Sequence, residues 1–327
     1  YTMPAELLAP ALACGNTVVW NPAPSTALCA VALAECVVEA DLPAGVFNLV
    51  TGPGPTVGNE IAANPGVHGV AFIGSTATGR LVAEAAAGKA ALLEMGGNGP
   101  IVVMDDADID RAVEATVSAC YLCAGQSCTA GERILVHRAV RDEYVEKLAR
   151  RVAREVILGN PFDDATTMGP LNNEGVAVKM DEHVGDALER GASVVAGGAR
   201  ADGYPTDLYW QATVLDNVPA DSRVATEETF GPIAPVVSVD SFDHAVELTN
   251  RSPFGLLAAI WTSDLGQGLE FADRIKTGWV NINESSNYWE SHLPFGGRAG
   301  SDSGIGRVGG AHVMDAFTEL QTVTFSR

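Results

Sequence analysis

Two short segments carry residues that could do covalent chemistry. Cys128 stands in a loop of small residues, G-Q-S-C-T-A from Gly125 to Ala130, where a substrate could reach it. A thiolate there is a stronger nucleophile than a hydroxyl. Glu94 ends an apolar run just before Gly96 and Gly97, where burial would raise its pKa toward the range of a general base. Each has a structural alternative, since most cysteines are structural and such a glutamate can cap a helix or pair with a cation.

A third segment could hold a phosphate. Residues 72–80 (F-I-G-S-T-A-T-G-R) read as a strand, a glycine turn and the start of a helix. Glycine lets the backbone approach a ligand closely, and the free N–H groups of a helix start favour an anion. The segment lacks the dinucleotide fingerprint G-x-G-x-x-G. By spacing alone, a phosphate site and an ordinary capped helix are equally good interpretations.

The elements that must position these residues alternate strand and helix. Strands are predicted at 16–20, 46–51, 67–73, 90–94, 101–104, 132–137, 193–196 and 279–281, and helices at 25–40, 80–87, 108–120, 141–154 and 174–190. Strands that alternate with helices imply parallel sheets with right-handed crossovers. The predicted fold class is therefore α/β, with a boundary near residue 97.

Composition limits the classes of function. A chain of 327 residues, 47% of them hydrophobic, is expected to form two domains. Its formal net charge of −21 is spread along the sequence and repels phosphate backbones and anionic lipid, so no nucleic acid and no membrane partner are expected. No apolar run approaches the length of a membrane span, and residues 1–4 lack the basic start of a signal peptide. A cytoplasmic location is expected.

Cysteine usage points to a reducing compartment. Six cysteines in a chain this long do not make a disulfide framework. Cys14, Cys29 and Cys36 lie in alanine-rich apolar surroundings and are interpreted as small core residues. Cys120 and Cys123 form a C-x-x-C, but no second pair stands at zinc spacing, so no metal site is expected.

In their order along the chain and in their residues, these motifs resemble those of the NAD(P)-dependent aldehyde dehydrogenase superfamily, and the resemblance covers essentially the whole chain. Residues 94–97 (E-M-G-G) are similar to the family's E-L-G-G motif, and 125–128 (G-Q-S-C) to its G-Q-x-C motif. Similar matches are found at 10–19 (P-A-L-A-C-G-N-T-V-V), 227–232 (E-E-T-F-G-P), 294–297 (P-F-G-G) and 303–307 (S-G-I-G-R).

The resemblance implies an aldehyde dehydrogenase-like fold, with a partial Rossmann-type cofactor domain plus an α/β catalytic domain. The implied domains are 1–96 for the cofactor, 97–297 for catalysis, and 298–327 as a return to the cofactor domain ending in an oligomerisation strand. The implied reaction oxidises an aldehyde to a carboxylic acid. Cys128 adds to the carbonyl, hydride passes from the thiohemiacetal to the nicotinamide, and water activated by Glu94 hydrolyses the thioester. The carboxylate of Glu94 favours release by water over transfer to coenzyme A.

The resemblance also implies the remaining site residues. NAD or NADP is expected as cofactor, with NAD favoured, and Glu228 and Phe230 are expected at the nicotinamide ribose. The full expected cofactor set is Trp20, Asn21, Pro22, Gly54, Phe72, Gly74, Ser75, Gly79, Met95, Gly96, Glu228 and Phe230. The expected substrate pocket, suited to an apolar or aromatic aldehyde, is Tyr121, Leu122, Ser127, Thr129, Tyr288, Trp289 and Phe295. For Tyr121, Leu122, Tyr288 and Trp289, a place in the core or at a subunit contact is an equal alternative.

Three departures from the family pattern affect the interpretation. The family's oxyanion-hole asparagine belongs to a W-N-x-P type segment that would precede Tyr1, so the chain is expected to be N-terminally truncated. Asn21 stands where the family has a lysine at the adenosine ribose, and Pro24 where NAD-preferring members have a glutamate. Weaker cofactor binding is expected, with NAD versus NADP open. The alternative function is a catalytically impaired remnant with a structural or interaction role. A homo-oligomer, dimer or tetramer, is expected to form through an exposed strand at 316–324.

Overall fold

The computed structural model describes residues 1–326, and the chain divides into two compact units. Of the described residues, unit 1 contains Tyr1–Met95, Trp289–Ala299 and 304–326, and unit 2 contains Gly96–Tyr288 and Gly300–Ser303. The junction at Met95 and Gly96 lies next to the boundary expected from the sequence. Residues 289–297, which the sequence analysis placed in the catalytic domain, belong to unit 1 instead.

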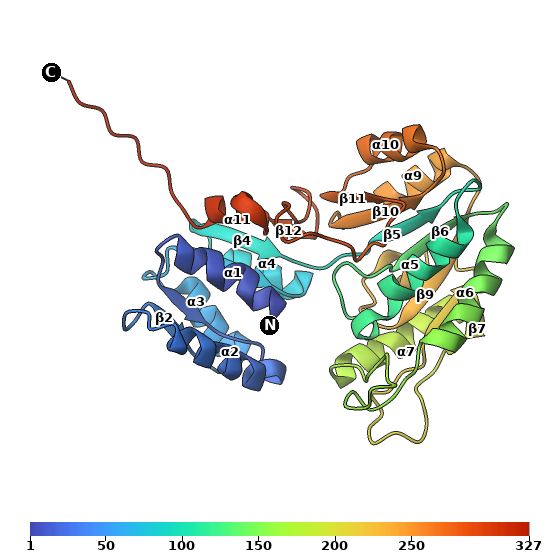
Figure 1. Ribbon diagram of the computed structural model, residues 1–327, viewed down its shortest axis with the longest axis horizontal. Coiled ribbons are helices and arrows are strands. Elements are labelled where there is room, and N and C mark those ends of the chain that lie inside the picture. Colours follow the sequence, from blue (N-terminus) through green and yellow to red (C-terminus); the bar gives the residue numbers. More distant parts are fainter. Residues whose placement is uncertain (327) are drawn as a thin grey trace. The chain divides into compact units, whose positions relative to one another are not determined.

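Unit 1 contains two small sheets and the helices that flank them (Figure 1). β1 (Val18–Trp20) pairs in parallel with β2 (Phe47–Leu49), and β3 (Gly69–Ile73) pairs in parallel with β4 (Ala90–Glu94). The returning chain adds β12 (Gly304–Ile305) antiparallel to β4. The helical elements are α1 (Thr2–Ala13), η1 (Pro24–Thr26), α2 (Ala27–Glu39), η2 (Gly54–Gly58), α3 (Asn59–Ala63), α4 (Thr76–Ala85) and α11 (Gly310–Ala316).

Unit 2 contains a seven-stranded sheet in the order β11-β10-β5-β6-β9-β8-β7. All neighbours run parallel except β7 and β8. The strands are β5 (Pro100–Val103), β6 (Arg133–His137), β7 (Ser193–Ala196), β8 (Thr213–Asp216), β9 (Ile233–Val239), β10 (Leu257–Trp261) and β11 (Trp279–Ile282). The helices are α5 (Ile109–Tyr121), η3 (Leu122–Gly125), α6 (Arg141–Glu155), α7 (Glu174–Glu189), α8 (Arg223–Thr226), α9 (Phe242–Asn250) and α10 (Leu265–Arg274). Figure 1 shows α5 and α6 side by side on one face of this sheet.

The central strands of unit 2 are apolar throughout because both faces of the sheet are covered. β5 and β10 are buried at every residue, the pattern expected for parallel strands packed on two sides. Several helices of unit 2 begin where a polar side chain accepts a backbone N–H. Asp108 caps α5 in this way, Asn173 caps α7 and Asp264 caps α10. These caps fix where each helix starts relative to the strand before it.

Three expectations about local structure are wrong. No helix was predicted at the start of the chain, where α1 occupies Thr2–Ala13 and contains Pro10. Cys29 and Cys36 are exposed rather than in the core, because α2 buries only Ala30 and Ala34. Among the described residues, 318–326 are exposed as expected but belong to no sheet. An edge strand forms only against a hydrogen-bonding neighbour.

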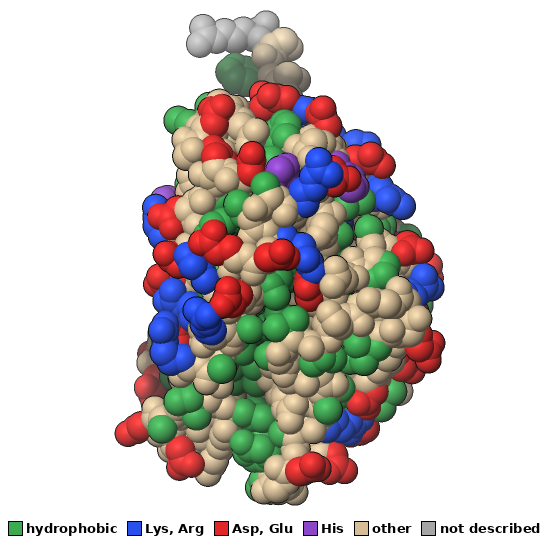
Figure 2. Space-filling model, turned by 90° about the vertical axis from the view of Figure 1, so that its right-hand side faces the viewer, with side chains coloured by type: hydrophobic (Ala, Val, Ile, Leu, Met, Phe, Trp, Pro, Cys, Tyr) green, Lys and Arg blue, Asp and Glu red, His purple; other side chains and the backbone are tan. Residues whose placement is uncertain are grey.

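The surface mixes charges of both signs. On the face shown in Figure 2, acidic and basic side chains alternate, with apolar side chains exposed between them. Within residues 1–326, no helix combines the length and the apolar character needed to cross a membrane. Across the same residues, no group of three or more His, Cys, Asp or Glu side chains could hold a metal ion.

Candidate active site

The loop that carries Cys128 begins with a strained turn. After α5 ends at Tyr121, Cys123 and Ala124 adopt left-handed backbone conformations with φ of 53° and 55°, which cost energy for residues with a side chain. Gly125 follows with φ of 68°. A Cβ on Gly125 would lie 2.1 Å from the carbonyl oxygen of Gly231, so only glycine allows this approach. The turn therefore bends the chain back toward the segment that includes Gly231.

Cys128 itself is partly exposed and is flanked by two hydroxyls that hold the loop. Ser127 Oγ and Thr129 Oγ1 lie 2.9 Å apart, and Ser286 Oγ donates to the Thr129 carbonyl at 2.8 Å. A Cβ on Gly97 would lie 2.1 Å from the Cys128 carbonyl oxygen. Any side chain at position 97 would therefore displace the backbone of the proposed nucleophile. Ser127 and Thr129, predicted in the substrate pocket, have hydroxyls that bond to each other.

Glu132 is a site residue that the sequence analysis missed. It is buried, and its two oxygens accept hydrogen bonds of 2.6 Å from the backbone N–H groups of Thr229 and Phe230. Phe230 has φ of 58°, a conformation that the carboxylate helps to hold. Burial, and then the like charge of Glu228, raise the pKa of Glu132 to about 8. The sequence feature that could have identified Glu132 is a charged residue at the start of a predicted apolar strand.

Glu228, predicted at the nicotinamide ribose, lies against the glycines that follow β4. Its Oε1 accepts a hydrogen bond of 2.8 Å from the N–H of Gly97. A Cβ on Gly96 would lie 2.7 Å from the same oxygen. Lys179 Nζ donates to the Glu228 carbonyl at 3.1 Å. Burial raises the pKa of the Glu228 carboxyl. Unit 2 thus brings together Gly96, Gly97 and Glu228 from distant parts of the sequence.

Glu94 ends β4 in unit 1, between Ile73 of β3 and Gly304 of β12. Its side chain is 5% exposed, and neither carboxyl oxygen has a hydrogen-bond partner among the described residues. Burial is the main reason that its pKa is raised to about 8; the charge of Arg307 lowers it and that of Glu6 raises it further. A buried carboxyl without a partner is uncommon in proteins and indicates a functional group.

Glu6 of unit 1 is a half-buried residue that the sequence analysis did not single out. Its Oε1 is buried without a partner among the described residues, and burial raises its pKa to about 7. Its charge acts on Glu94, so the two carboxyls titrate under each other's influence. An acidic residue in an otherwise apolar helix, T-M-P-A-E-L-L-A-P-A-L-A, was the signal.

The predicted cofactor residues of unit 1 lie mainly at the carboxyl ends of parallel strands, the edge where α/β sheets bind ligands. Trp20 ends β1, and Pro22 beyond it is buried. Asn21 donates from Nδ2 to the carbonyls of Val50, at 2.9 Å, and Gly52, at 3.2 Å. Asn21 therefore joins the ends of β1 and β2. Gly54 starts η2, and a Cβ there would meet no atom within 4 Å.

The segment after β3 uses its glycines for internal packing. A Cβ on Gly74 would lie 2.5 Å from the ring of Phe72, and one on Gly79 would lie 2.1 Å from Met95 Sδ. Ser75 is the N-cap of α4, with its Oγ accepting the N–H of Thr78 at 3.3 Å. The capped-helix interpretation accounts for these residues. Gly74 and Ser75 are also exposed, so the helix start is open to a ligand.

The predicted substrate residues divide between the two units. Tyr121 is a core residue of unit 2, since it is 3% exposed and its hydroxyl donates to the Thr213 carbonyl at 2.8 Å. Its prediction as a pocket residue is therefore wrong. Leu122 and Tyr288, also in unit 2, are exposed. In unit 1, the rings of Trp289 and Phe295 pack with their centroids 5.9 Å apart.

Comparison with known proteins shows similarity along nearly the full chain. A model of the aldehyde dehydrogenase family matches residues 1–323. The chain is 42% identical to a benzaldehyde dehydrogenase (NAD+) of Pseudomonas putida, over 97% of the chain and 64% of that protein. It is 38% identical to an alpha-ketoglutaric semialdehyde dehydrogenase of Bacillus subtilis, over 98% of the chain and 66% of that protein. It therefore spans slightly less than two thirds of these relatives.

Solved structures of similar sequence have the same fold. An NADP-dependent enzyme of Escherichia coli superposes with a TM-score of 0.92 at 39% identity, covering 97% of this chain and 65% of that one. A glyceraldehyde-3-phosphate dehydrogenase of Methanocaldococcus jannaschii, solved with NADP, gives a TM-score of 0.93 at 32% identity, covering 99% and 70%. The sequence-predicted α/β fold of the aldehyde dehydrogenase type is confirmed.

Proposed function

Because the chain belongs to the aldehyde dehydrogenase family, we propose that it supplies the nucleophile and the general base for NAD(P)-dependent oxidation of an aldehyde to a carboxylic acid. Glu94 is the observation that carries the proposal, since its carboxyl is buried, has a raised pKa and has no partner among the described residues. An ion-paired or capping glutamate would have used those oxygens. Cys128 is partly exposed in a loop fixed on both sides, as a nucleophile requires.

The first half of the proposed reaction takes place on Cys128. Its thiolate adds to the aldehyde carbonyl carbon, and the former carbonyl oxygen carries the negative charge in the thiohemiacetal. That oxyanion needs N–H donors, and the backbone N–H of Cys128 is proposed as one. Bound NAD(P)+ supplies the hydride acceptor. Loss of hydride leaves a thioester between Cys128 and the oxidised carbon. Gly97 keeps the Cys128 backbone in position because no side chain separates them.

The second half is proposed to use Glu94. The carboxylate removes a proton from water, the resulting hydroxide adds to the thioester carbonyl, and the acid leaves with regeneration of the Cys128 thiolate. A base with pKa near the working pH combines a useful ionised fraction with sufficient basicity, and the pKa of Glu94 is raised to about 8. Release by water rather than coenzyme A follows from a carboxylate acting at this step.

The residues present fit a dinucleotide cofactor. In unit 1, Asn21 joins the carboxyl ends of two parallel strands, and the start of α4 is open at Gly74 and Ser75. Helix N–H groups at such an edge suit a pyrophosphate. In unit 2, Glu228 is proposed to accept the hydroxyls of the nicotinamide ribose, next to Phe230. NAD is proposed ahead of NADP, and relatives with either cofactor in their names are similar to this chain.

An apolar or aromatic aldehyde is the proposed substrate class. Leu122 and Tyr288 of unit 2 are exposed, and Trp289 and Phe295 of unit 1 form an aromatic pair. Benzaldehyde and vanillin dehydrogenases are among the similar proteins, at 42% and 41% identity. We further propose a homo-oligomer, dimer or tetramer. Leu320, Val323 and Phe325 are almost fully exposed and would be covered if that segment paired with another subunit.

The test separates the two half-reactions. Glu94→Gln should release a burst of NAD(P)H about equal to the number of active sites and then turn over slowly, since only hydrolysis needs the base. Cys128→Ser should give no burst, and Glu84→Gln, at an exposed position on α4, should behave as the parent. Loss of the burst in Glu94→Gln would assign Glu94 to the first half-reaction. A folded parent protein inactive with every aldehyde would favour the impaired remnant.

A further inference from the structure

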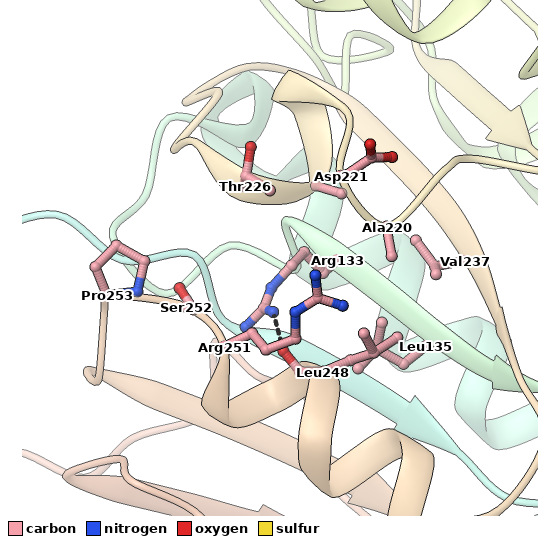
Figure 3. Close-up of a pocket in the computed structure, with 11 residues that line it drawn as sticks. Arg133, Leu135, Ala220, Asp221, Thr226, Val237, Leu248, Arg251, Ser252 and Pro253 are labelled. Carbon is pink, nitrogen blue, oxygen red and sulfur yellow. Dashed lines mark hydrogen bonds between the residues drawn. The ribbon is translucent and has the colours of Figure 1, made fainter. Parts of the chain in front are cut away.

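Unit 2 contains a cavity that the proposed reaction does not use. It has a volume of about 170 Å³, and Cys128 and Glu228 are not part of its wall. The lining residues come from β6 and β9, from the loop and helix before Glu227, and from the end of α9 with the residues that follow it (Figure 3): Arg133, Leu135, Ala220, Asp221, Ala225, Thr226, Val237, Leu248, Arg251, Ser252 and Pro253. A cavity of this size admits a small ion.

Two arginines face this cavity. Arg133 is 5% exposed, and its guanidinium donates from Nε to the Asn98 carbonyl at 3.0 Å and from Nη1 to the Leu248 carbonyl at 2.8 Å. Nη2 has no partner among the described residues. Figure 3 shows the guanidinium of Arg251 beside that of Arg133 at the same cavity. Burial lowers the pKa of Arg133 to about 10, so it remains charged at neutral pH.

The acidic groups nearby are engaged elsewhere. Glu132, next to Arg133 in sequence, accepts the N–H groups of Thr229 and Phe230. Asp221 lies at the cavity wall but is 3.3 Å from Arg190 Nη1. Arg251 forms no ion pair with any described residue. In a chain of formal charge −21, two neighbouring guanidinium groups without a carboxylate between them are unexpected.

The rest of the wall suits an anion that needs donors on one side only. Ser252 Oγ accepts the N–H of Phe254 at 3.3 Å, which leaves its own hydrogen free to donate. The wall also includes the apolar side chains of Leu135 and Val237, which are buried. These apolar surroundings lower the local dielectric constant around the buried Arg133, where charge-assisted hydrogen bonds are stronger; Arg251 is exposed.

We propose that this cavity is a binding site for a small tetrahedral oxyanion, either free phosphate or the phosphoryl end of a small metabolite. Arg133 Nη2, the Arg251 guanidinium and the Ser252 hydroxyl supply the donors. Arginine suits this chemistry because its planar fork bonds two oxygens at once. The bound anion neutralises the charge of the two guanidinium groups and links the end of α9 to the start of β6.

The experiment is calorimetric titration of inorganic phosphate into the full chain, at fixed ionic strength with chloride as the reference anion. Saturable binding is expected for the parent. Arg251→Gln should weaken it at least about tenfold, the effect of losing one charge-assisted contact. Arg150→Gln is the matched control, because Arg150 is an exposed arginine outside the cavity. Arg133 is left intact because it also holds two backbone carbonyls.

A parallel titration with methyl phosphate distinguishes the two sources. Equal affinity for both anions would mean that the cavity takes the phosphoryl end of a larger molecule, and binding of inorganic phosphate alone would mean a free ion. The proposal is overturned if the parent shows no saturable binding up to about 10 mM phosphate. It is equally overturned if Arg251→Gln binds phosphate as tightly as Arg150→Gln.

Discussion

The backbone N–H of Gly97 donates a hydrogen bond of 2.8 Å to Oε1 of Glu228. This bond joins the segment after β4 to the E-E-T-F-G-P segment, more than a hundred residues later in the chain. Glu228→Ala would leave the N–H without its acceptor, which costs about 1–3 kcal/mol for a buried group. Glu228→Gln keeps an oxygen in place and should cost less. Urea unfolding of both variants measures the difference.

The neighbouring residue provides the control for that prediction. The Glu227 side chain is about half exposed, pairs with Arg223 and lies 3.4 Å from Nε2 of His183, and exposed pairs contribute about 0–1 kcal/mol. Glu227→Ala should therefore cost about 1 kcal/mol or less. Equal stability of Glu228→Ala and Glu227→Ala would show that the Gly97 bond contributes nothing to the fold.

Two substitutions should move the pH dependence of turnover in opposite directions. The charge of Glu6 raises the pKa of Glu94 and that of Arg307 lowers it. Glu6→Gln should shift the rising limb of the kcat profile to lower pH, and Arg307→Gln should shift it to higher pH. With a pKa of about 8, only about a tenth of Glu94 is ionised at pH 7; a fall of one unit would raise this to about a half. Shifts of the same sign would contradict the assignment of Glu94 as the base.

Protein stability should fall between about pH 5 and pH 9. The pKa of Glu132 rises from 4.5 to about 8 on folding, mainly through burial, so in this range the folded state holds a proton that the unfolded state has released. The contribution of Glu132 to the free energy of unfolding is thus fully present below the unfolded pKa of 4.5 and is lost as the pH rises through 8. Each pKa unit corresponds to about 1.4 kcal/mol. Glu132→Gln cannot ionise and should therefore lose less stability than the parent between pH 5 and pH 9. Urea unfolding at several pH values gives the free energy of unfolding as a function of pH for the parent and for Glu132→Gln. If the two proteins show the same slope, Glu132 is not responsible for the pH dependence.

Asn21 should matter for stability as well as for the cofactor. Its Nδ2 donates to the carbonyls of Val50 and Gly52, so Asn21→Ala should destabilise unit 1 by about 1–2 kcal/mol and weaken NAD(P) binding. Asn48→Ala is a suitable comparison, since Asn48 makes similar bonds to the carbonyls of Val18 and Gly45 near the opposite ends of the strands. Cofactor binding weakened equally by both variants would mean that position 21 has no specific role.

Thiol labelling should separate Cys128 from Cys120. Cys120 is 1% exposed, its Sγ donates to the Gly131 carbonyl, and burial raises its pKa. It should react with iodoacetamide only after unfolding. Cys123 is exposed and should be labelled without effect on activity, as Cys123→Ser should confirm. The size of the NAD(P)H burst should fall in proportion to the fraction of Cys128 that is labelled, which peptide mapping measures. Labelling of the other cysteines should not change the burst. If the burst falls in proportion to the labelling of Cys123 instead, Cys123 rather than Cys128 is the nucleophile.

The sequence predicted eight of the strands because each is a short apolar run between turn residues. β4 and β7 match their expected bounds, and the other six differ by one to three residues, whereas β8, β9, β10 and β12 were given no bounds. α1 was missed because Pro10 and the glycine after it suggest a break rather than a helix. Cys29 and Cys36 were placed in the core because an alanine-rich helix looks the same from its sequence whether one face or all faces are buried.

Site residues could be predicted from the sequence only where a single short segment contains both the reactive residue and its recognisable motif. Cys128 and Glu94 follow from short motifs, as does the capped turn at Gly74 and Ser75. Glu132 and Glu6 could not be found that way, because their roles depend on backbone N–H groups and buried surroundings contributed by distant segments. Tyr121 shows the converse, since an aromatic residue near the nucleophile in sequence points into the core.

The route of the chain has a consequence for its synthesis on the ribosome. Glu94 ends β4, but β12, the strand that pairs with the other side of β4, begins at Gly304, after the last residue of unit 2. At translation rates of about 5–20 residues per second, roughly 10–40 s pass between the two. During that interval unit 2 can fold almost completely, whereas β4 has one edge open to competing strands. Chaperones or slow codons before Gly304 would therefore affect unit 1 more than unit 2.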